Sequence, residues 1–263
     1  MEQTGINAAC EAALKKLAFF KYRARYFVYS GLAGCFCAMG MALACSVAAG
    51  VYSSEAIRGM YKFMLAFMFT LSFTMIIFAG SELFTGNVLV MTIASLQKKI
   101  KFSQGLRLLA FCYFANISGG FLMSIVIAQT GILTGQTGEM VVSLAGEKAA
   151  LSFAQAFFRG VMCNTMVCLG TWCVLKLKSE SAKLIILFWA VTGFVALGYE
   201  HSIANAALFT MAAFAESASE MNNWQGVFFN MLSCTLGNIA GGSLFVGFVY
   251  WFSGRDGQNL TAA

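Results

Sequence analysis

Charge, proline and histidine are all scarce in this chain of 263 residues: charged side chains make up 11%, proline is absent and there is one histidine. A soluble domain carries about a quarter charged residues, so the low charge excludes an ordinary soluble protein. Hydrophobic residues make up 59%, and several apolar runs exceed the ~18 residues typical of a membrane-spanning helix. The sequence predicts an integral membrane protein whose helices, without proline, are broken by glycine and tertiary contacts.

Metal and redox chemistry have little support among the residues available. One histidine cannot supply the paired ligands of a haem. Most of the nine cysteines lie in apolar runs, where cysteine behaves as a small hydrophobe, and their spacings differ from those of zinc ligands. We therefore expect no metal, no cofactor and no enzymatic activity. The net charge of +6 reflects membrane-protein loops and does not indicate nucleic-acid binding.

Six apolar segments separated by charged clusters predict an all-α polytopic protein with six transmembrane helices. They cover residues 27–51, 62–97, 106–131, 150–175, 184–215 and 224–252. Six spans place both termini on one side, which holds 13 of the 17 lysines and arginines, so that side is predicted to be cytoplasmic. We expect a cytoplasmic amphipathic helix at 1–26, a single six-span domain at 27–252 and a cytoplasmic tail at 253–263.

Two of these segments are longer than a membrane requires, and each contains a polar stretch in its middle. "GSELFTGN" at 80–87 and "GYEHSIAN" at 198–205 share glycine, glutamate and asparagine at their first, third and eighth positions. Further along each half, "NISGG" at 116–120 resembles "NIAGG" at 238–242. Because each half has three spans, the second half enters the membrane from the opposite side. This pattern predicts two inverted three-helix repeats with the second and fifth helices broken.

Broken helices of this kind indicate a transport site. The free N–H and C=O groups survive in a membrane only when they are buried in protein or line a wet cavity. The N-terminal ends of the half-helices carry partial positive charge, so a path between them favours anions.

Four polar residues are the candidates for binding an anion. His201 is an ionisable residue inside a span, where such residues usually mark a pathway, and it can hold an anion or pass it a proton. Thr85 offers either a pore hydroxyl or a loop cap, and Asn164 lies within an apolar run. Lys148 either attracts anions in a vestibule or extends its amine to the membrane surface.

The two glutamates at matching positions of the repeat are better suited to a structural role than to anion binding. A bare carboxylate repels an anion, so Glu82 and Glu200 are expected to brace the loops by accepting backbone N–H bonds or by staying protonated. Asn87 and Asn205 are expected to bond across helices. The consecutive residues Glu200, His201 and Ser202 diverge and do not form a hydrolase triad.

Four motifs in order resemble the formate/nitrite transporter family over residues 10–253. They are "GSELFTGN", "CNTMVCLGTW" at 163–172, "GYEHSIAN" and "TLGNIAGG" at 235–242. The resemblance implies a homopentamer of aquaporin-like protomers in a prokaryotic cytoplasmic membrane, each protomer with its own pore. Proline found near the last two motifs in many members is missing here, which bears on local gating geometry.

Five bulky residues flank the two breaks, and they either pack plainly or form apolar constrictions that strip water. The resemblance implies that Leu83, Phe84 and Phe194 form the cytoplasmic constriction, and that Phe69 and Phe73 form the external one. Thr85 and His201 would face the chamber between them.

The expected function is a channel for small monovalent anions of weak acids: nitrite, hydrosulfide or formate. The alternative is an aquaporin-type facilitator of neutral solutes, whose mark is a pair of Asn-Pro-Ala motifs, and this chain has no proline.

Overall fold

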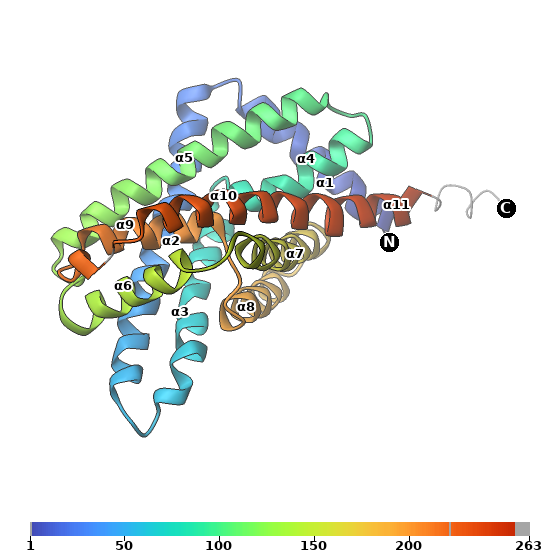
Figure 1. Ribbon diagram of the computed structural model, residues 1–263. Helices are drawn as coiled ribbons and strands as arrows, with labels where there is room; N and C mark the ends of the chain where they lie inside the picture. The colour runs from blue at the N-terminus through green and yellow to red at the C-terminus, as the bar shows by residue number, and fades with distance from the viewer. Residues whose placement is uncertain (1, 221, 256–263) are drawn as a thin grey trace.

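The computed structural model describes residues 2–220 and 222–255, which fold into helices joined by short connections (Figure 1). The helices are α1 Glu2–Phe19, α2 Arg23–Ser53, α3 Tyr61–Met75, α4 Phe84–Leu96, α5 Phe102–Gln129, α6 Gly135–Ala149, α7 Phe153–Lys176, α8 Glu180–Ala196, α9 Ser202–Phe214, α10 Trp224–Ala240 and α11 Val249–Arg255. Shorter turns of 3-10 or π helix lie at Arg58–Met60, Ile76–Gly80, Ala218–Glu220 and Gly241–Phe248. Of the expected tail, residues 256–263 lie outside the described residues.

Six spans follow from these helices, so the prediction of an all-α polytopic membrane protein is confirmed. Among the described residues, five helical stretches are long and apolar enough to cross a membrane: Arg23–Ser53, Arg58–Gly80, Phe102–Gln129, Phe153–Lys176 and Trp224–Gly254. The second span is completed by α4 after a break. The fifth predicted span consists of α8 and α9, with 17 and 13 residues, so neither half alone has the length of a span.

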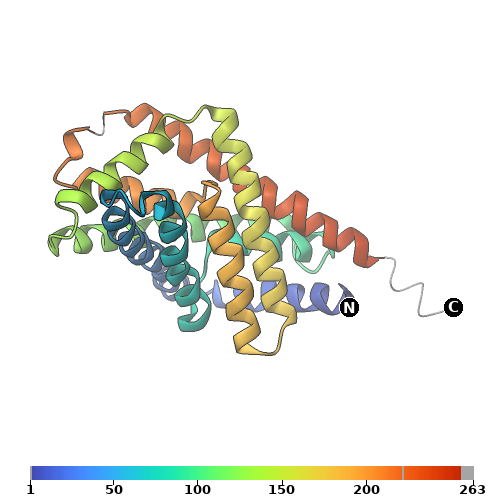
Figure 2. The ribbon, with the colours of Figure 1, turned by 90° about the horizontal axis from the view of Figure 1, so that it is seen from below.

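The two halves repeat the same packing. In the first half α2 packs against α3 and α5, and in the second α7 packs against α8 and α10. The halves meet where α3 contacts α8, and Figure 2 shows these two helices side by side. The broken spans therefore face each other across the centre of the molecule.

A helix precedes the three spans of each half, and the sequence predicted one only for the first half. α1 packs against α4, and α6 packs against α9, so each lies beside the inner half of its broken span. The connection at 130–152, which the sequence showed only as a charged cluster, is thus ordered as helix. Each repeat consists of a leading helix and three spans.

Glycine allows the spans within each half to approach closely. A Cβ at Gly34 on α2 would lie 1.8 Å from the carbonyl oxygen of Asn116 on α5. In the second half, a Cβ at Gly237 on α10 would lie 2.2 Å from the carbonyl oxygen of Phe157 on α7. The helix backbones are in direct contact at both positions, as is common where small residues line the contacts between membrane helices.

We predict that Gly34→Ala destabilises the protein because the new methyl group forces α2 away from α5. Overpacking of this kind costs about 1–3 kcal/mol. The measurement is the thermal melting temperature of the purified protein in detergent. Gly50→Ala on the same helix is the matched control, since a Cβ there meets nothing within 4 Å. Equal melting of the two variants would show that this crossing tolerates a wider separation.

Candidate functional site

Both broken spans change direction at a glycine and resume four residues later. Gly80 and Gly198 have positive φ angles of 84° and 67°, a conformation that side chains with a Cβ rarely adopt. The following half-helices begin after extended residues, Leu83 before α4 and His201 before α9. The shared glycines of the two sequence motifs therefore serve the same turn, and Leu83 and His201 occupy equivalent positions.

Asn116 on α5 holds the first break. Its Oδ1 accepts a hydrogen bond from the backbone N–H of Phe84 at 2.9 Å, the first amide of α4. Its Nδ2 donates to the carbonyl oxygens of Glu82 at 2.8 Å and Ser30 at 2.7 Å. One buried amide side chain thus satisfies backbone groups on both sides of the break.

Asn238 on α10 makes the equivalent bonds at the second break. Its Oδ1 accepts from the backbone N–H of Ser202 at 2.9 Å. Its Nδ2 donates to the carbonyl oxygens of Glu200 and Gly160, each at 2.9 Å. The correspondence shows that the "NISGG" and "NIAGG" motifs repeat because the breaks need the same side chain.

The carboxylate of Glu82 is held by side chains from three elements. Lys16 Nζ on α1 lies 2.7 Å from Oε1, and Tyr26 OH and Asn87 Nδ2 donate to Oε2 at 3.2 and 2.9 Å. We expected either backbone amides as the donors or a protonated carboxyl, and the described contacts to the carboxylate come from side chains. The first amide of α4 is already bonded to Asn116, so the glutamate binds the leading helix instead.

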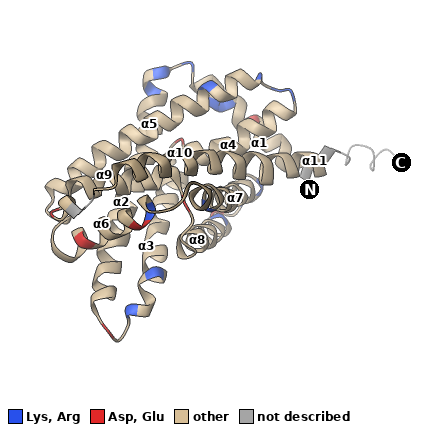
Figure 3. Cartoon of the chain, in the orientation of Figure 1, with Lys and Arg blue, Asp and Glu red and all other residues tan. Residues whose placement is uncertain are grey.

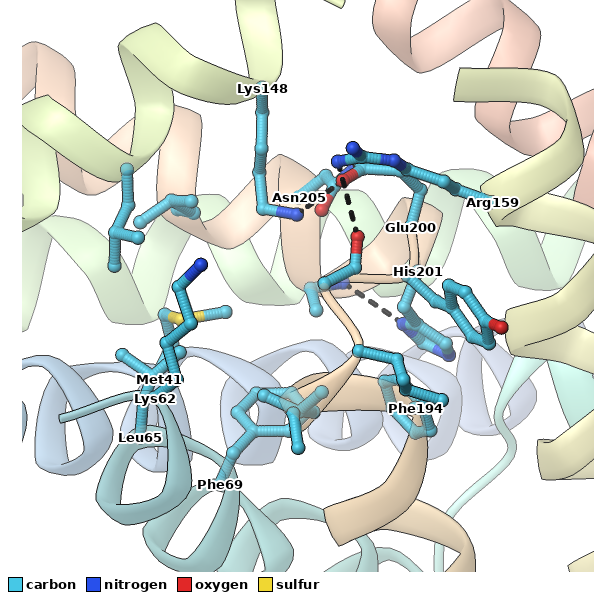
Figure 4. A pocket seen from close by; sticks show the side chains of 18 of the residues that line it. Met41, Lys62, Leu65, Phe69, Lys148, Arg159, Phe194, Glu200, His201 and Asn205 are labelled. Atoms are coloured by element: carbon cyan, nitrogen blue, oxygen red, sulfur yellow. Dashed lines mark hydrogen bonds and ion pairs between the residues drawn. The ribbon is translucent and has the colours of Figure 1, made fainter. Parts of the chain in front are cut away.

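Glu200 repeats this arrangement in the second half. Lys148 Nζ at the end of α6 lies 2.6 Å from Oε1, while Asn205 and Asn230 donate to Oε2 at 2.6 and 3.1 Å (Figure 4). The Glu200 side chain is 1% exposed and that of Lys148 is 19% exposed. Lys148, which we expected either to attract anions in a vestibule or to extend to the membrane surface, is thus neutralised by a buried partner.

His201 connects the two broken spans. Its Nδ1 accepts a hydrogen bond from the backbone N–H of Ala204 at 3.2 Å, which makes it the N-cap of α9. Its Nε2 lies 2.9 Å from Thr85 Oγ1, in the first turn of α4. Because Nδ1 is an acceptor, the neutral ring carries its proton on Nε2, which donates to Thr85. Leu83, at the equivalent position, provides no side-chain cap.

Three phenylalanines cover the imidazole on one side. Ring centroids of Phe73 and Phe194 lie 5.5 and 6.0 Å from that of His201, and Phe69 lies 6.4 Å from both phenylalanines. Phe194 thus contacts the pair that we expected to form a separate external constriction. The reason is that α8 packs along α3 and ends beside it.

The ring of Phe84 lies elsewhere, against Tyr113 on α5 at 5.0 Å between centroids. It lines an apolar cavity between α4, α5 and α10, not the cavity that reaches His201. Leu83 is 6% exposed and is the residue before α4. The structure therefore brings Phe194 together with Phe69 and Phe73, while Phe84 turns toward α5.

A cavity of about 250 Å3 leads to His201 from one face of the protein. Figure 4 shows Phe69, Phe194 and His201 at its inner end and the amines of Lys148 and Lys62 pointing into it. The charged residues of its lining are Lys62, Lys148, Arg159, Glu147 and Glu200. Cations exceed carboxylates there. Lys148 is paired with Glu200, whereas within the described part of the chain neither Lys62 nor Arg159 takes part in an ion pair, and no sequence motif singled out either residue.

Asn164 contacts the backbone of Thr85 and not the cavity. Its Nδ2 donates to the carbonyl oxygen of Asn238 at 2.6 Å and to that of Thr85 at 3.3 Å. It is fully buried and is absent from the lining of the cavity that reaches His201. Its contacts link the first turn of α4 to α7 and α10, so it fixes the position of Thr85.

Inverted halves, two broken spans and a buried Thr–His pair where those spans meet define a polytopic membrane channel of the aquaporin-like type. The chain belongs to the formate/nitrite transporter family, whose model, "Formate/nitrite transporter", matches residues 3–252. This family consists of channels and transporters, not enzymes.

Individual relatives agree with this assignment. The chain is 32% identical to the nitrite transporter NirC of Escherichia coli, over 87% of this chain and 83% of that protein. It is 31% identical to a probable formate transporter of Methanothermobacter thermautotrophicus, over 87% and 88%. Among solved structures, an FNT family ion channel has a TM-score of 0.87 at 28% identity, covering 96% of this chain and 99% of that one. A pentameric formate channel with formate bound has a TM-score of 0.75 at 27% identity, covering 89% and 98%.

We predict that Glu200→Gln lowers stability sharply, because it leaves the Lys148 amine without its charge partner in a half-buried site. Removing one member of a buried pair costs about 3–5 kcal/mol. Lys183→Gln is the control, since its partner Glu180 is 66% exposed and such a pair contributes at most about 1 kcal/mol. Thermal melting of both variants is the measurement. The double variant Lys148→Gln/Glu200→Gln should recover part of the loss, and no recovery would contradict the pairing argument.

Proposed function

We propose that this chain is a channel for small monovalent anions of weak acids, namely nitrite, formate or hydrosulfide. Relatives named as nitrite and formate transporters support the first two, and the small size of hydrosulfide suits the same site. The observation that carries the proposal is the hydrogen bond between Thr85 and His201, buried where the N-terminal ends of α4 and α9 meet. Positive helix ends and hydrogen-bond donors at one point favour an anion.

The cavity of about 250 Å3 that leads to His201, here called the vestibule, concentrates the anion. Its lining holds the cations of Lys62 and Arg159 against the carboxylate of Glu147, and the Lys148–Glu200 pair is neutral as a unit. An excess of positive charge in a cleft raises the local concentration of anions. The pair holds Lys148 in place and keeps the loop carboxylate from repelling the substrate.

The aromatic cluster at the inner end of the vestibule, Phe69, Phe73 and Phe194, is a hydrophobic constriction. All three side chains are buried, at 1%, 3% and 1% exposure. An anion that passes them sheds water before it reaches His201, and apolar constrictions of this kind control permeation by dewetting. Leu83, two residues before Thr85, is proposed to form part of a constriction on the other side of the Thr85–His201 pair.

The anion is bound through the hydroxyl of Thr85. The ring of His201 donates its Nε2–H to Thr85 Oγ1, because Nδ1 is occupied by the amide of Ala204. The hydroxyl hydrogen of Thr85 is then available to an anion. Donation from His201 polarises this hydroxyl, since chains of hydrogen bonds strengthen one another in a low dielectric.

Proton transfer to the anion is the costlier alternative. If Thr85 gave up its proton and took the one on Nε2, a neutral ring would become an imidazolate. To avoid this, His201 must first be protonated on Nδ1, which breaks the cap on α9. The geometry therefore favours binding by hydrogen-bond donation, with protonation coupled to loss of the cap.

The same proposal includes assembly and orientation. A similar solved structure is a pentameric channel, and we propose a homopentamer for this chain as well, in a prokaryotic cytoplasmic membrane. The face that carries α1 and α11, which pack together at the right of Figure 1, is proposed to be cytoplasmic because lysine and arginine are concentrated on that side.

We predict that His201→Asn lowers anion flux into liposomes by about 2- to 10-fold, because it removes the hydrogen bond that His201 donates to the anion-binding hydroxyl of Thr85, and a neutral hydrogen bond contributes about 0.5–1.5 kcal/mol. Asparagine is a good N-cap, so α9 should keep its cap and the protein its melting temperature. His201→Ala should lose both flux and stability. The assay compares nitrite, formate and hydrosulfide side by side. Unchanged flux in both variants would refute the role of His201, and rapid water or glycerol flux without anion flux would favour the aquaporin-type facilitator.

We predict that Thr85→Val, which keeps the shape but removes the hydroxyl, lowers anion flux by about tenfold or more. Thr85→Ser retains the hydroxyl and should conduct at close to the unmodified rate. Flux measured in liposomes at matched protein density tests this pair. Equal loss in the two variants would indicate that the methyl group, not the hydroxyl, matters at this position.

A further inference from the structure

A second open cavity, of about 390 Å3, lies on the opposite side of the protein from the vestibule, beside α1. It is enclosed by α1, the turn into α2, the loop between α4 and α5, and the first turns of α5. Its ten lining residues include four cations and no carboxylate: Lys21, Arg23, Lys99 and Arg107. Figure 3 shows lysine and arginine gathered over these elements at the top of the molecule. The volume is in the range of small-molecule sites.

These cations are free of acidic partners. Among the described residues, none of Lys21, Arg23, Lys99 and Arg107 takes part in an ion pair. The neighbouring lysines of α1 differ, since Lys15 pairs with Glu11 and Lys16 pairs with Glu82. Four unneutralised charges around one cavity repel one another unless an anion lies between them.

One of the cations is also held in place. The guanidinium of Arg23 lies 3.3 Å from the ring centroid of Phe20 and 5.9 Å from that of Phe111. Stacking on an aromatic face occupies the flat side of a guanidinium, and its N–H groups point outward at the edge. A planar fork of this kind matches phosphate oxygens in a bidentate manner.

The surroundings of the cavity are apolar and exposed. Tyr22 is 61% exposed, Phe102 74% and Leu106 55%. Phe102 and Leu106 are four residues apart and share the face of α5 that lines the neighbouring apolar cavity, while Gln104 and Arg107 on another face of the same turns line this one. Apolar side chains at the end of a membrane span contact lipid, and aromatic residues concentrate at the interface.

We propose that this cavity binds the headgroup of an anionic phospholipid from the adjacent leaflet. The phosphodiester lies among Lys21, Arg23, Lys99 and Arg107, and the acyl chains extend along the exposed face of Phe102 and Leu106. Basic pockets between spans recognise anionic headgroups by this combination of charge and depth. A free phosphate would use the cations but gain nothing from the apolar face, so a lipid is the occupant that matches both.

The proposed lipid also explains why the site lies at α1. Lys16 of this helix pairs with Glu82 at the first break, so a lipid bound at α1 and α5 stabilises the helix that holds the loop brace. The proposal concerns the outer surface of the protomer and is independent of which anion the channel conducts.

The test measures binding of phosphatidylglycerol to the purified full-length protein by native mass spectrometry, with phosphatidylcholine as the neutral lipid. The unmodified protein should retain phosphatidylglycerol in preference to phosphatidylcholine. Lys99→Gln/Arg107→Gln should weaken this binding by about fivefold for each cation removed, the factor equivalent to about 1 kcal/mol per charge. Lys98→Gln/Lys178→Gln, which removes the same charge from exposed positions outside the cavity, is the matched control and should bind as the unmodified protein does.

Three results would overturn the proposal. Equal weakening in the two double variants would mean that binding follows net charge, not the cavity. Binding of inorganic phosphate that Lys99→Gln/Arg107→Gln abolishes, together with no preference of the unmodified protein for phosphatidylglycerol over phosphatidylcholine, would identify a soluble phosphate site. Dissociation of the oligomer in Lys99→Gln/Arg107→Gln, with lipid binding retained by the subunits, would identify a contact with a second copy of the chain.

Discussion

The need to satisfy backbone hydrogen bonds at two broken helices inside a membrane determines most of this structure. Hydrocarbon offers no partner to a free N–H or C=O, and each break exposes several. Asn116 and Asn238 meet this need with the same three bonds in each half. Because each side chain bonds a span in its own half as well as the break, it fixes the half-helix relative to the bundle.

The ion pairs of the two loop glutamates follow from these asparagine contacts. With the first amides of α4 and α9 bonded to asparagine, Glu82 and Glu200 extend to the leading helices and pair with Lys16 and Lys148. The pairs neutralise two acids that would otherwise oppose an anion. They also make α1 and α6 part of the central site, although neither helix spans the membrane. The lipid proposed at α1 would act on the same support.

The residues proposed to form the anion site lie where the two halves of the repeat differ. His201 corresponds to Leu83, and only the histidine caps its half-helix. Asn164 lies four residues after Gly160 and corresponds to Gly34, four residues after Ser30; only Asn164 reaches across to Thr85. Both departures converge on Thr85. The repeat places the N-terminal ends of α4 and α9 opposite each other. His201 and Asn164, which have no polar counterpart in the first half, add hydrogen-bond donors directed at Thr85.

Sequence determined the spans, both breaks and the repeat, because these depend on local apolar length and on residues at fixed spacing, such as Gly80 and Gly198. It also singled out His201 and Thr85 by their polarity within apolar runs. Only the tertiary structure decided that Phe194 contacts Phe69 and Phe73, that Lys148 is paired, and that α6 is the counterpart of α1. These depend on contacts between residues far apart in the chain. The lysine partner of each glutamate follows from helix packing, for which residue spacing along the chain gives no local signal.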